Sequence, residues 1–203
     1  MRTQFMSAVA VIGLWMPLTV AAQDFGVLNS AETINRGNVK LMGSPMVVFG
    51  EDGADNTHGF ALAAGYGFTD RFDVEGKLAF FDDVTFLGAD AEVWLARTRP
   101  VYVSAIVGFH VGRQEGFNTR AFDATLLASG FLTPRLELFG GLDLARHAIE
   151  DRDDGFTTVH VVPGIEYAIS PRLDFVAELG IGLNDEASNY LTGGLAFYFG
   201  PRP

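Results

Sequence analysis

The sequence predicts an all-β fold, namely a closed up-and-down antiparallel β-barrel that spans a membrane with about ten strands. Three observations lead to this prediction. Apolar and polar residues alternate along most of the chain, tight and long connections alternate between these segments, and no amphipathic helix is available to cover an apolar sheet face. The mean hydropathy of +0.21 is high for a chain in which 19% of the 203 residues are charged. Charges that recur every few residues argue against membrane helices, which need about 20 consecutive apolar residues.

The first 22 residues are predicted to be a cleaved signal peptide. Arg2 supplies a positive start, residues 5–20 are apolar, and Ala21 and Ala22 offer small residues for cleavage. Pro17 interrupts the apolar run and no cationic stop-transfer segment follows it, which favours cleavage over a membrane anchor. The predicted organisation is therefore a signal peptide at 1–22, a periplasmic N-terminal segment at 23–37 and a transmembrane barrel domain at 38–200.

The N-terminal segment, residues 23–37, carries a weak local signal. Ser30 is typical of a helix N-cap, which predicts a helical turn over residues 30–33. Two placements stay open for the segment: it lies across the periplasmic mouth of the barrel, or it is loose.

The period of the hydrophobic pattern predicts the strands. Successive side chains of a strand point to opposite faces, so a strand between two different solvents alternates with period two. In the segment 72–80, Val74 and Leu78 share one face, whereas Glu75 and Lys77 share the other. The same alternation predicts strands at 38–50, 57–70, 72–80, 87–95, 101–110, 122–132, 136–144, 159–169, 173–183 and 191–199.

The connections between these strands are of two kinds, which alternate. Four are tight and carry arginine, at 69–71, 97–100, 133–135 and 170–172, and three of them share a hydroxyl residue, Asp or Pro, and then Arg. Five are acidic and mostly longer, at 51–56, 82–83, 113–118, 147–155 and 184–188. In a meander with an even number of strands, the tight turns lie at one end of the barrel and the long connections at the other. Both termini are then expected at the tight-turn end. If segment 38–50 or the hairpin at 82–84 does not form, about eight strands are expected instead.

The apolar face of this sheet is predicted to face lipid. A soluble fold would need a second layer over that face, whereas closing the sheet and turning the face outward requires only hydrocarbon as solvent. The segments are long enough, because about 9–11 tilted residues cross a bilayer. Aromatic residues on the apolar parity also fall near both strand ends, as interfacial girdles do: Tyr66, Phe68, Phe72, Tyr167 and Phe199 at one end, and Phe49, Phe60, Phe80, Phe109 and Phe122 at the other.

The leader, the meander and the last strand resemble the small outer-membrane β-barrel proteins of Gram-negative bacteria. In that family the last strand often ends in a lipid-facing aromatic residue that the barrel-assembly machinery reads. Phe197 and Phe199 match this pattern, although the chain continues for four residues beyond them. The resemblance implies export to the cell outer membrane, a monomeric barrel, and contact with outer-membrane lipid and lipopolysaccharide.

The face opposite the apolar one predicts an acidic lumen, in which Lys40, Lys77, His110 and His160 are the basic groups. Ten strands enclose little more than a packed interior, so carboxylates there need partners. The predicted lumen carboxylates are Asp73, Glu75, Asp90, Glu92, Asp123, Glu137, Asp143, Glu166, Asp174 and Glu178.

Several of these carboxylates fall near the tight-turn end, beside the arginines of the turns. Two arrangements are open: a ring of Arg–carboxylate pairs that closes the periplasmic mouth, or a hydrated polar lumen. The periplasmic-turn arginines are Arg71, Arg97, Arg99, Arg135 and Arg172.

The pattern favours an integral outer-membrane protein with a structural or surface-interaction role and no catalysis. The acidic lumen supports one alternative, a narrow cation-preferring, porin-like channel. A second alternative is a lipid-modifying hydrolase, because Ser104, Ser129, His110 and His160 share the lumen with many acids. The outer-membrane lipid A deacylases carry a His-x-Ser motif on the lipid-facing side. In this chain no His is followed by Ser two residues later.

Composition disfavours other classes of function. The formal net charge of −11 argues against nucleic acid, and the absence of Cys excludes thiolate metal sites and disulfide scaffolds. The acidic run at 150–155 lacks the ligand spacing of a Ca²⁺ loop, and the glycines lack phosphate-loop spacing. We therefore expect no cofactor, no metal and no catalytic residues, while divalent ions could bridge the acidic outer loops to lipopolysaccharide.

Overall fold

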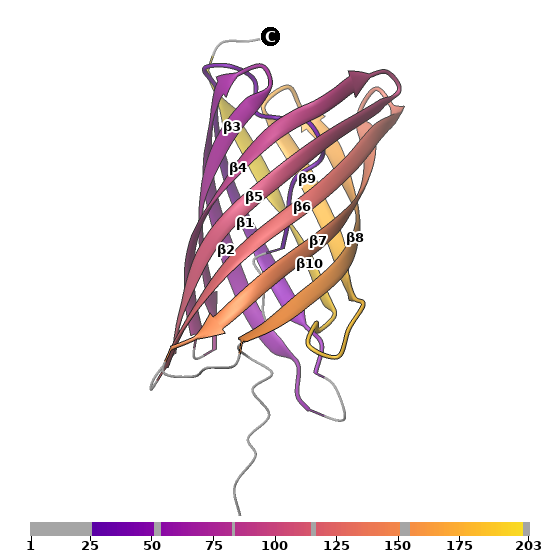
Figure 1. Ribbon diagram of the computed structural model, residues 1–203. Helices are drawn as coiled ribbons and strands as arrows, with labels where there is room; N and C mark the ends of the chain where they lie inside the picture. Colours follow the sequence, from indigo (N-terminus) through magenta and orange to yellow (C-terminus); the bar gives the residue numbers. More distant parts are fainter. Residues whose placement is uncertain (1–25, 51–53, 83, 115–116, 151–154, 201–203) are drawn as a thin grey trace, which may run out of the picture.

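The computed structural model describes residues 26–50, 54–82, 84–114, 117–150 and 155–200 as a closed antiparallel barrel (Figure 1). Neighbouring strands follow chain order, and β1 closes the barrel against β10 with Val39 opposite Phe199. This confirms the predicted fold class with ten strands. The predicted signal peptide lies outside the described residues. The strands are β1 (Val39–Val48), β2 (Thr57–Thr69), β3 (Phe72–Phe81), β4 (Val84–Thr98), β5 (Val101–Gln114), β6 (Phe117–Thr133), β7 (Leu136–Ile149), β8 (Gly155–Ser170), β9 (Leu173–Gly182) and β10 (Tyr190–Phe199).

The repeated sequence of the tight turns has a structural cause. In three turns the hydroxyl of the strand's last residue accepts a hydrogen bond from the amide of the arginine two positions on: Thr69 from Arg71 at 3.1 Å, Thr133 from Arg135 at 3.3 Å and Ser170 from Arg172 at 3.3 Å. The strand before each of the four tight turns also carries a register shift close to the turn. Such bulges increase local twist and help a strand to end its pairing.

At the opposite end of the barrel, the loop end, the middle strands run further than the sequence predicted. Residues 113–118 were expected to form a connection, yet Arg113 pairs with Asn118 across the β5–β6 ladder. His147, expected in a loop, is buried in β7. These predictions were wrong because apolar alternation stops where the outer face leaves lipid, while backbone pairing continues beyond that level. Residues 151–154 of the acidic run lie outside the described residues.

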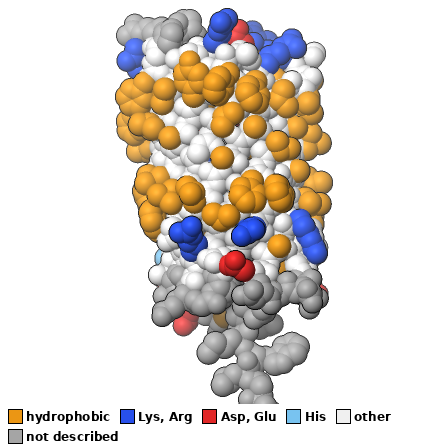
Figure 2. Space-filling view, turned by 60° about the vertical axis from the view of Figure 1, so that its left-hand side comes forward, with side chains coloured by type: hydrophobic (Ala, Val, Ile, Leu, Met, Phe, Trp, Pro, Cys, Tyr) orange, Lys and Arg blue, Asp and Glu red, His pale blue; other side chains and the backbone are white. Residues whose placement is uncertain are grey.

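The outer face of the barrel is apolar. All ten residues predicted for the two aromatic girdles are exposed. Figure 2 shows hydrophobic side chains over one face in two broad bands, with Lys and Arg side chains beyond each band. Two apolar bands flanked by charges match a bilayer with its headgroup regions. Among the described residues, no helix is long and apolar enough to cross a membrane.

The interior is filled by side chains of the opposite parity. Phe86, Met46, Leu127 and Val176 are buried in a single apolar cluster, and Val27, from the segment before β1, belongs to it. Polar and charged side chains are buried alongside this cluster. Side chains therefore fill the part of the lumen around this cluster.

We predict that a charge on the outer face destabilises the barrel according to its depth. Leu126, 53% exposed, lies midway along β6, whereas Leu132, 66% exposed, lies beside the tight turn. Leu126→Arg should lower the free energy of unfolding by about 2–4 kcal/mol, and the matched control Leu132→Arg by only about 0–1 kcal/mol. Denaturant unfolding in lipid vesicles measures both values. Equal effects at the two positions would contradict the membrane depth assigned to β6.

Candidate functional site

The described part of the N-terminal segment lies inside the barrel, which neither of the two placements left open by the sequence had included. We call residues 26–37 the plug segment; it is the indigo trace that runs through the interior in Figure 1. Leu28, Ala31 and Ile34 are buried, and residues 30–33 form no helix, contrary to the N-cap prediction. At its C-terminal end Gly37, with φ +78°, donates a hydrogen bond to the carbonyl of Gly67 at 2.8 Å and leads into β1.

Glu178 of β9 holds the inner end of the plug segment. One carboxylate oxygen accepts the amide of Val27 at 2.8 Å, and the other accepts the amide of Leu28 at 2.6 Å. Tyr190 of β10 donates its hydroxyl to the same carboxylate at 3.0 Å. Leu28 has a positive φ of 52°, and this conformation lets two successive amides face one anion. A buried carboxylate thus gains three donors, two of them from the plug backbone.

Two lysines join the barrel wall to the plug carbonyls. Lys77 forms an ion pair with Asp90 at 2.5 Å and donates to the carbonyls of Gly26 and Val27 at 3.3 Å each. Lys40 pairs with Glu75 at 2.8 Å and also donates to the Asn29 side chain. These ammonium groups therefore neutralise wall carboxylates and bind the plug segment at the same time.

Further contacts hold the middle of the plug segment. The amide of Ile34 donates to Asp73 at 2.6 Å, and the amide of Ala31 donates to the hydroxyl of Ser129 at 3.2 Å. The carbonyl of Ala31 accepts a hydrogen bond from the indole nitrogen of Trp94. Side chains of β3, β4 and β6 thus bind the backbone of one short stretch from three sides.

The structure places every predicted lumen carboxylate on the inner side of the wall. Asp73, Glu75, Glu92, Glu137, Asp143 and Glu178 are buried, and Asp90, Asp123, Glu166 and Asp174 are half-buried. The predicted Arg–carboxylate ring is not formed: all five turn arginines are exposed, and the ion pairs in the described part of the chain involve Lys40, Lys77 and His110. At the tight-turn end the guanidinium of Arg97 lies 4.3 Å above the ring of Trp94, so it packs on an aromatic side chain in place of a wall carboxylate.

Histidines gather in the lumen toward the loop end. The Nδ1 atom of His110 lies 3.3 Å from Asp123, and the ring of His147 lies 5.6 Å from that of His110. His160 contacts the backbone carbonyl of Ser188 through Nε2 at 3.1 Å. Ser129, one of the two serines considered for a hydrolase, is occupied by the plug amide of Ala31. In the part of the chain that the structure describes, no group of three or more His, Asp or Glu side chains is arranged to hold a metal ion.

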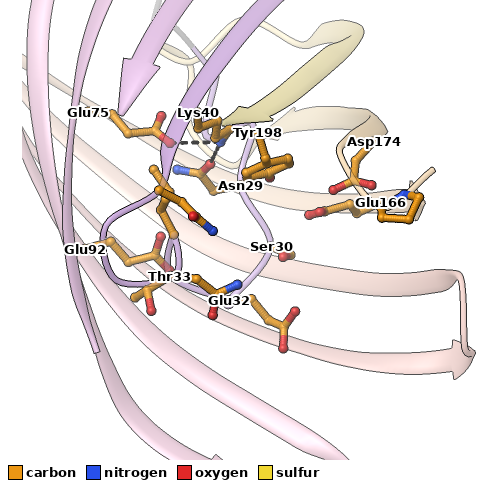
Figure 3. A pocket seen from close by; sticks show the side chains of 14 residues that line it. Asn29, Ser30, Glu32, Thr33, Lys40, Glu75, Glu92, Glu166, Asp174 and Tyr198 are labelled. Atoms are coloured by element: carbon orange, nitrogen blue, oxygen red, sulfur yellow. Dashed lines mark hydrogen bonds and ion pairs between the residues drawn. The ribbon is translucent and has the colours of Figure 1, made fainter. Parts of the chain in front are cut away.

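A cavity of about 150 Å³ lies between the plug segment and the tight-turn end of the wall (Figure 3). Five carboxylates line it, together with Lys40 and the ring of Tyr198. Burial raises the pKa of Glu32, the carboxylate that the plug segment contributes, and the negative charge of Glu166 adds to the rise, while Arg97 and Arg99 oppose it.

Sequence reasoning missed the plug segment and His147. The plug is held largely through its own amides and carbonyls, which leave no trace in a hydrophobic pattern. The nearest signal in the sequence was the pair of glycines that bracket the segment, Gly26 and Gly37, which both have positive φ in the structure.

We predict that Glu178→Ala loosens the plug segment and leaves the barrel folded. Two amides lose a charged acceptor, and each such hydrogen bond contributes about 1.5–3 kcal/mol. Hydrogen exchange at Val27 and Leu28 should therefore accelerate by about tenfold or more, while exchange in β5 and β6 stays unchanged. Asp185→Ala, in an exposed connection, is the matched control. Unchanged exchange at Val27 and Leu28 in the Glu178 variant would contradict this assignment.

No protein-family model matches the chain, and a search of curated proteins found no match. Solved structures with a similar fold include an outer membrane channel from Pseudomonas putida F1, which is 11% identical, covers 83% of this chain and 98% of that chain, and gives a TM-score of 0.59. They also include the NanC porin, which is 7% identical, covers 78% of this chain and 98% of that chain, and gives a TM-score of 0.50. At these identities the similarity concerns the fold, which is the transmembrane β-barrel fold of outer-membrane proteins.

Proposed function

We propose that this chain is an outer-membrane channel that is closed in this structure by its own plug segment and that prefers cations when open. The observation that carries the proposal is the way the wall charges are satisfied. Glu178 and Asp73 accept hydrogen bonds from plug amides, and Lys77 donates to plug carbonyls. A permanently solid barrel needs only contacts among its own strands, whereas this wall binds a separate stretch of backbone.

The preference for cations follows from the charges that displacement of the plug would expose. Buried charges without partners are costly, so water must enter when the plug leaves. The wall then presents ten carboxylates against Lys40 and Lys77. A narrow hydrated passage lined by one sign of charge selects the opposite sign. The similar solved structures described as a channel and a porin support the same class of function.

A structural or surface-interaction role without conduction is the second candidate. The buried apolar cluster around Phe86, Met46 and Leu127 favours it, because these wall side chains fill part of the lumen whether or not the plug is present. In either case we propose a non-catalytic, monomeric protein. Phe197 and Phe199, both exposed on the last strand, would present the signal read by the barrel-assembly machinery, and the outer surface would contact lipid and lipopolysaccharide.

A reversible disulfide tests the channel proposal. The chain has no Cys, and the amide of Ala31 lies 3.2 Å from the hydroxyl of Ser129. A double variant carrying Ala31→Cys and Ser129→Cys should tether the plug to β6 when oxidised. We expect no conductance from the oxidised double variant in planar bilayers, and cation-preferring openings after reduction.

Each single variant is the matched control and should conduct with or without reductant. Silence of the wild type and of the reduced double variant at high salt would reject the channel and leave the structural role.

A further inference from the structure

We propose that the cavity at the tight-turn end is a binding site for a small organic cation that carries amino groups at both ends, that is, an aliphatic diamine or polyamine. The site lies between the plug segment and strands β1, β3, β4, β8, β9 and β10. The inference goes beyond the proposed channel, because it concerns a ligand bound at the mouth and requires no conduction.

The cavity reaches the surface at the tight-turn end. Asn35 of the plug segment and Pro171 of the β8–β9 turn line it, and both are exposed. A ligand on this side of the membrane can therefore enter without moving the plug. The end of β10 lies with the tight turns, at the end that the sequence predicts to be periplasmic, so such a ligand would come from the periplasm.

The charge of the lining selects a cation. Glu32, Glu75, Glu92, Glu166 and Asp174 line the cavity, and Lys40 is the one basic side chain among its described lining residues. Lys40 is already engaged by Glu75 and by the Asn29 side chain. The remaining carboxylates repel anions and attract positive charge.

Two buried acceptors in the cavity lack a donor. Glu92 is 3% exposed and its Oε1 atom has no hydrogen-bond partner among the described residues. Asn38 is 7% exposed, and its Oδ1 atom also has no hydrogen-bond partner among the described residues. Buried oxygens are normally satisfied, and each one left without a partner is costly. Both atoms lack the same thing, an N–H or O–H donor, which an ammonium group supplies.

The arrangement of the carboxylates indicates the shape of the ligand. Figure 3 shows Glu75 and Glu92 on one side of the cavity and Glu166 and Asp174 on the other, with Glu32 and Tyr198 between the two sides. Two separated acidic ends suit two separated ammonium groups joined by an aliphatic chain. The ring of Tyr198 offers a face for methylene groups or for a cation.

A bare metal ion fits this cavity less well. Ca²⁺ needs six to eight oxygen ligands at about 2.3–2.6 Å. Within the described ranges, no three His, Asp or Glu side chains come together in such an arrangement. The carboxylates lie too far apart to surround one metal ion. The same spacing suits a long cation with a positive charge at each end.

Binding of 1,4-diaminobutane to the purified full-length barrel in detergent tests the proposal by titration calorimetry. We expect saturable binding to the wild type. Glu92→Gln and Glu166→Gln remove one charge from each side with little change of shape, and each should weaken binding by about tenfold or more, since a hydrogen bond to a charged group contributes about 1.5–3 kcal/mol. Asp185→Asn, on an exposed connection away from the cavity, should bind like the wild type.

Two further ligands separate a built site from general attraction to an acidic protein. Butylamine, with one amino group, should bind about tenfold or more weakly than the diamine, and Mg²⁺ at equal concentration should not displace the diamine. Absence of saturable binding, displacement by Mg²⁺, or equal affinity of both cavity variants and the wild type would overturn the proposal. The Glu92 and Glu166 variants test the site independently. If one of them misfolds, the affinity of the other still tests the proposal. Because binding is measured in detergent, a silent channel does not affect the result.

Discussion

The structure depends on how charges are satisfied inside a barrel that is surrounded by hydrocarbon. The outer face needs only apolar side chains, and the strands supply them. The inner face carries ten carboxylates and two lysines, most of them buried, and a buried charge is costly without a partner. The backbone of residues 26–34 supplies partners to Glu178, Asp73, Lys40 and Lys77. The plug segment therefore stabilises the wall and also blocks the lumen.

The same constraint explains why the middle of the lumen differs from its tight-turn end. Around Glu178 and Lys77, plug amides and carbonyls meet the charges directly. Around Glu92 and Asn38, nearer the tight turns, acceptors outnumber donors and a cavity opens. The plug backbone thus supplies hydrogen-bond partners to charges in the middle of the barrel, whereas Glu92 and Asn38 near the mouth lack a donor that a soluble cation can supply.

Much of the fold could be predicted from the sequence, because lipid and lumen impose opposite demands on successive residues. Residues such as Leu78 and Glu75 reveal their faces by parity alone, and the hydroxyl–Arg turns mark where strands reverse. Partners could not be predicted in the same way. Parity puts Asp73 inside but cannot show that the amide of Ile34, thirty-nine positions earlier, satisfies it, in place of an arginine from a nearby turn. His147 was missed because alternation fades where the wall rises above the lipid.

The seam between β1 and β10 has a consequence for biogenesis. It joins the first and last strands, so its formation must await the rest of the meander, since contacts distant in sequence carry the largest loop-closure cost. The plug segment precedes β1 directly through Gly37. If the plug segment already contacts its charged partners when β1 pairs with β10, closure of the seam encloses it. If it does not, the plug segment must enter the barrel after closure.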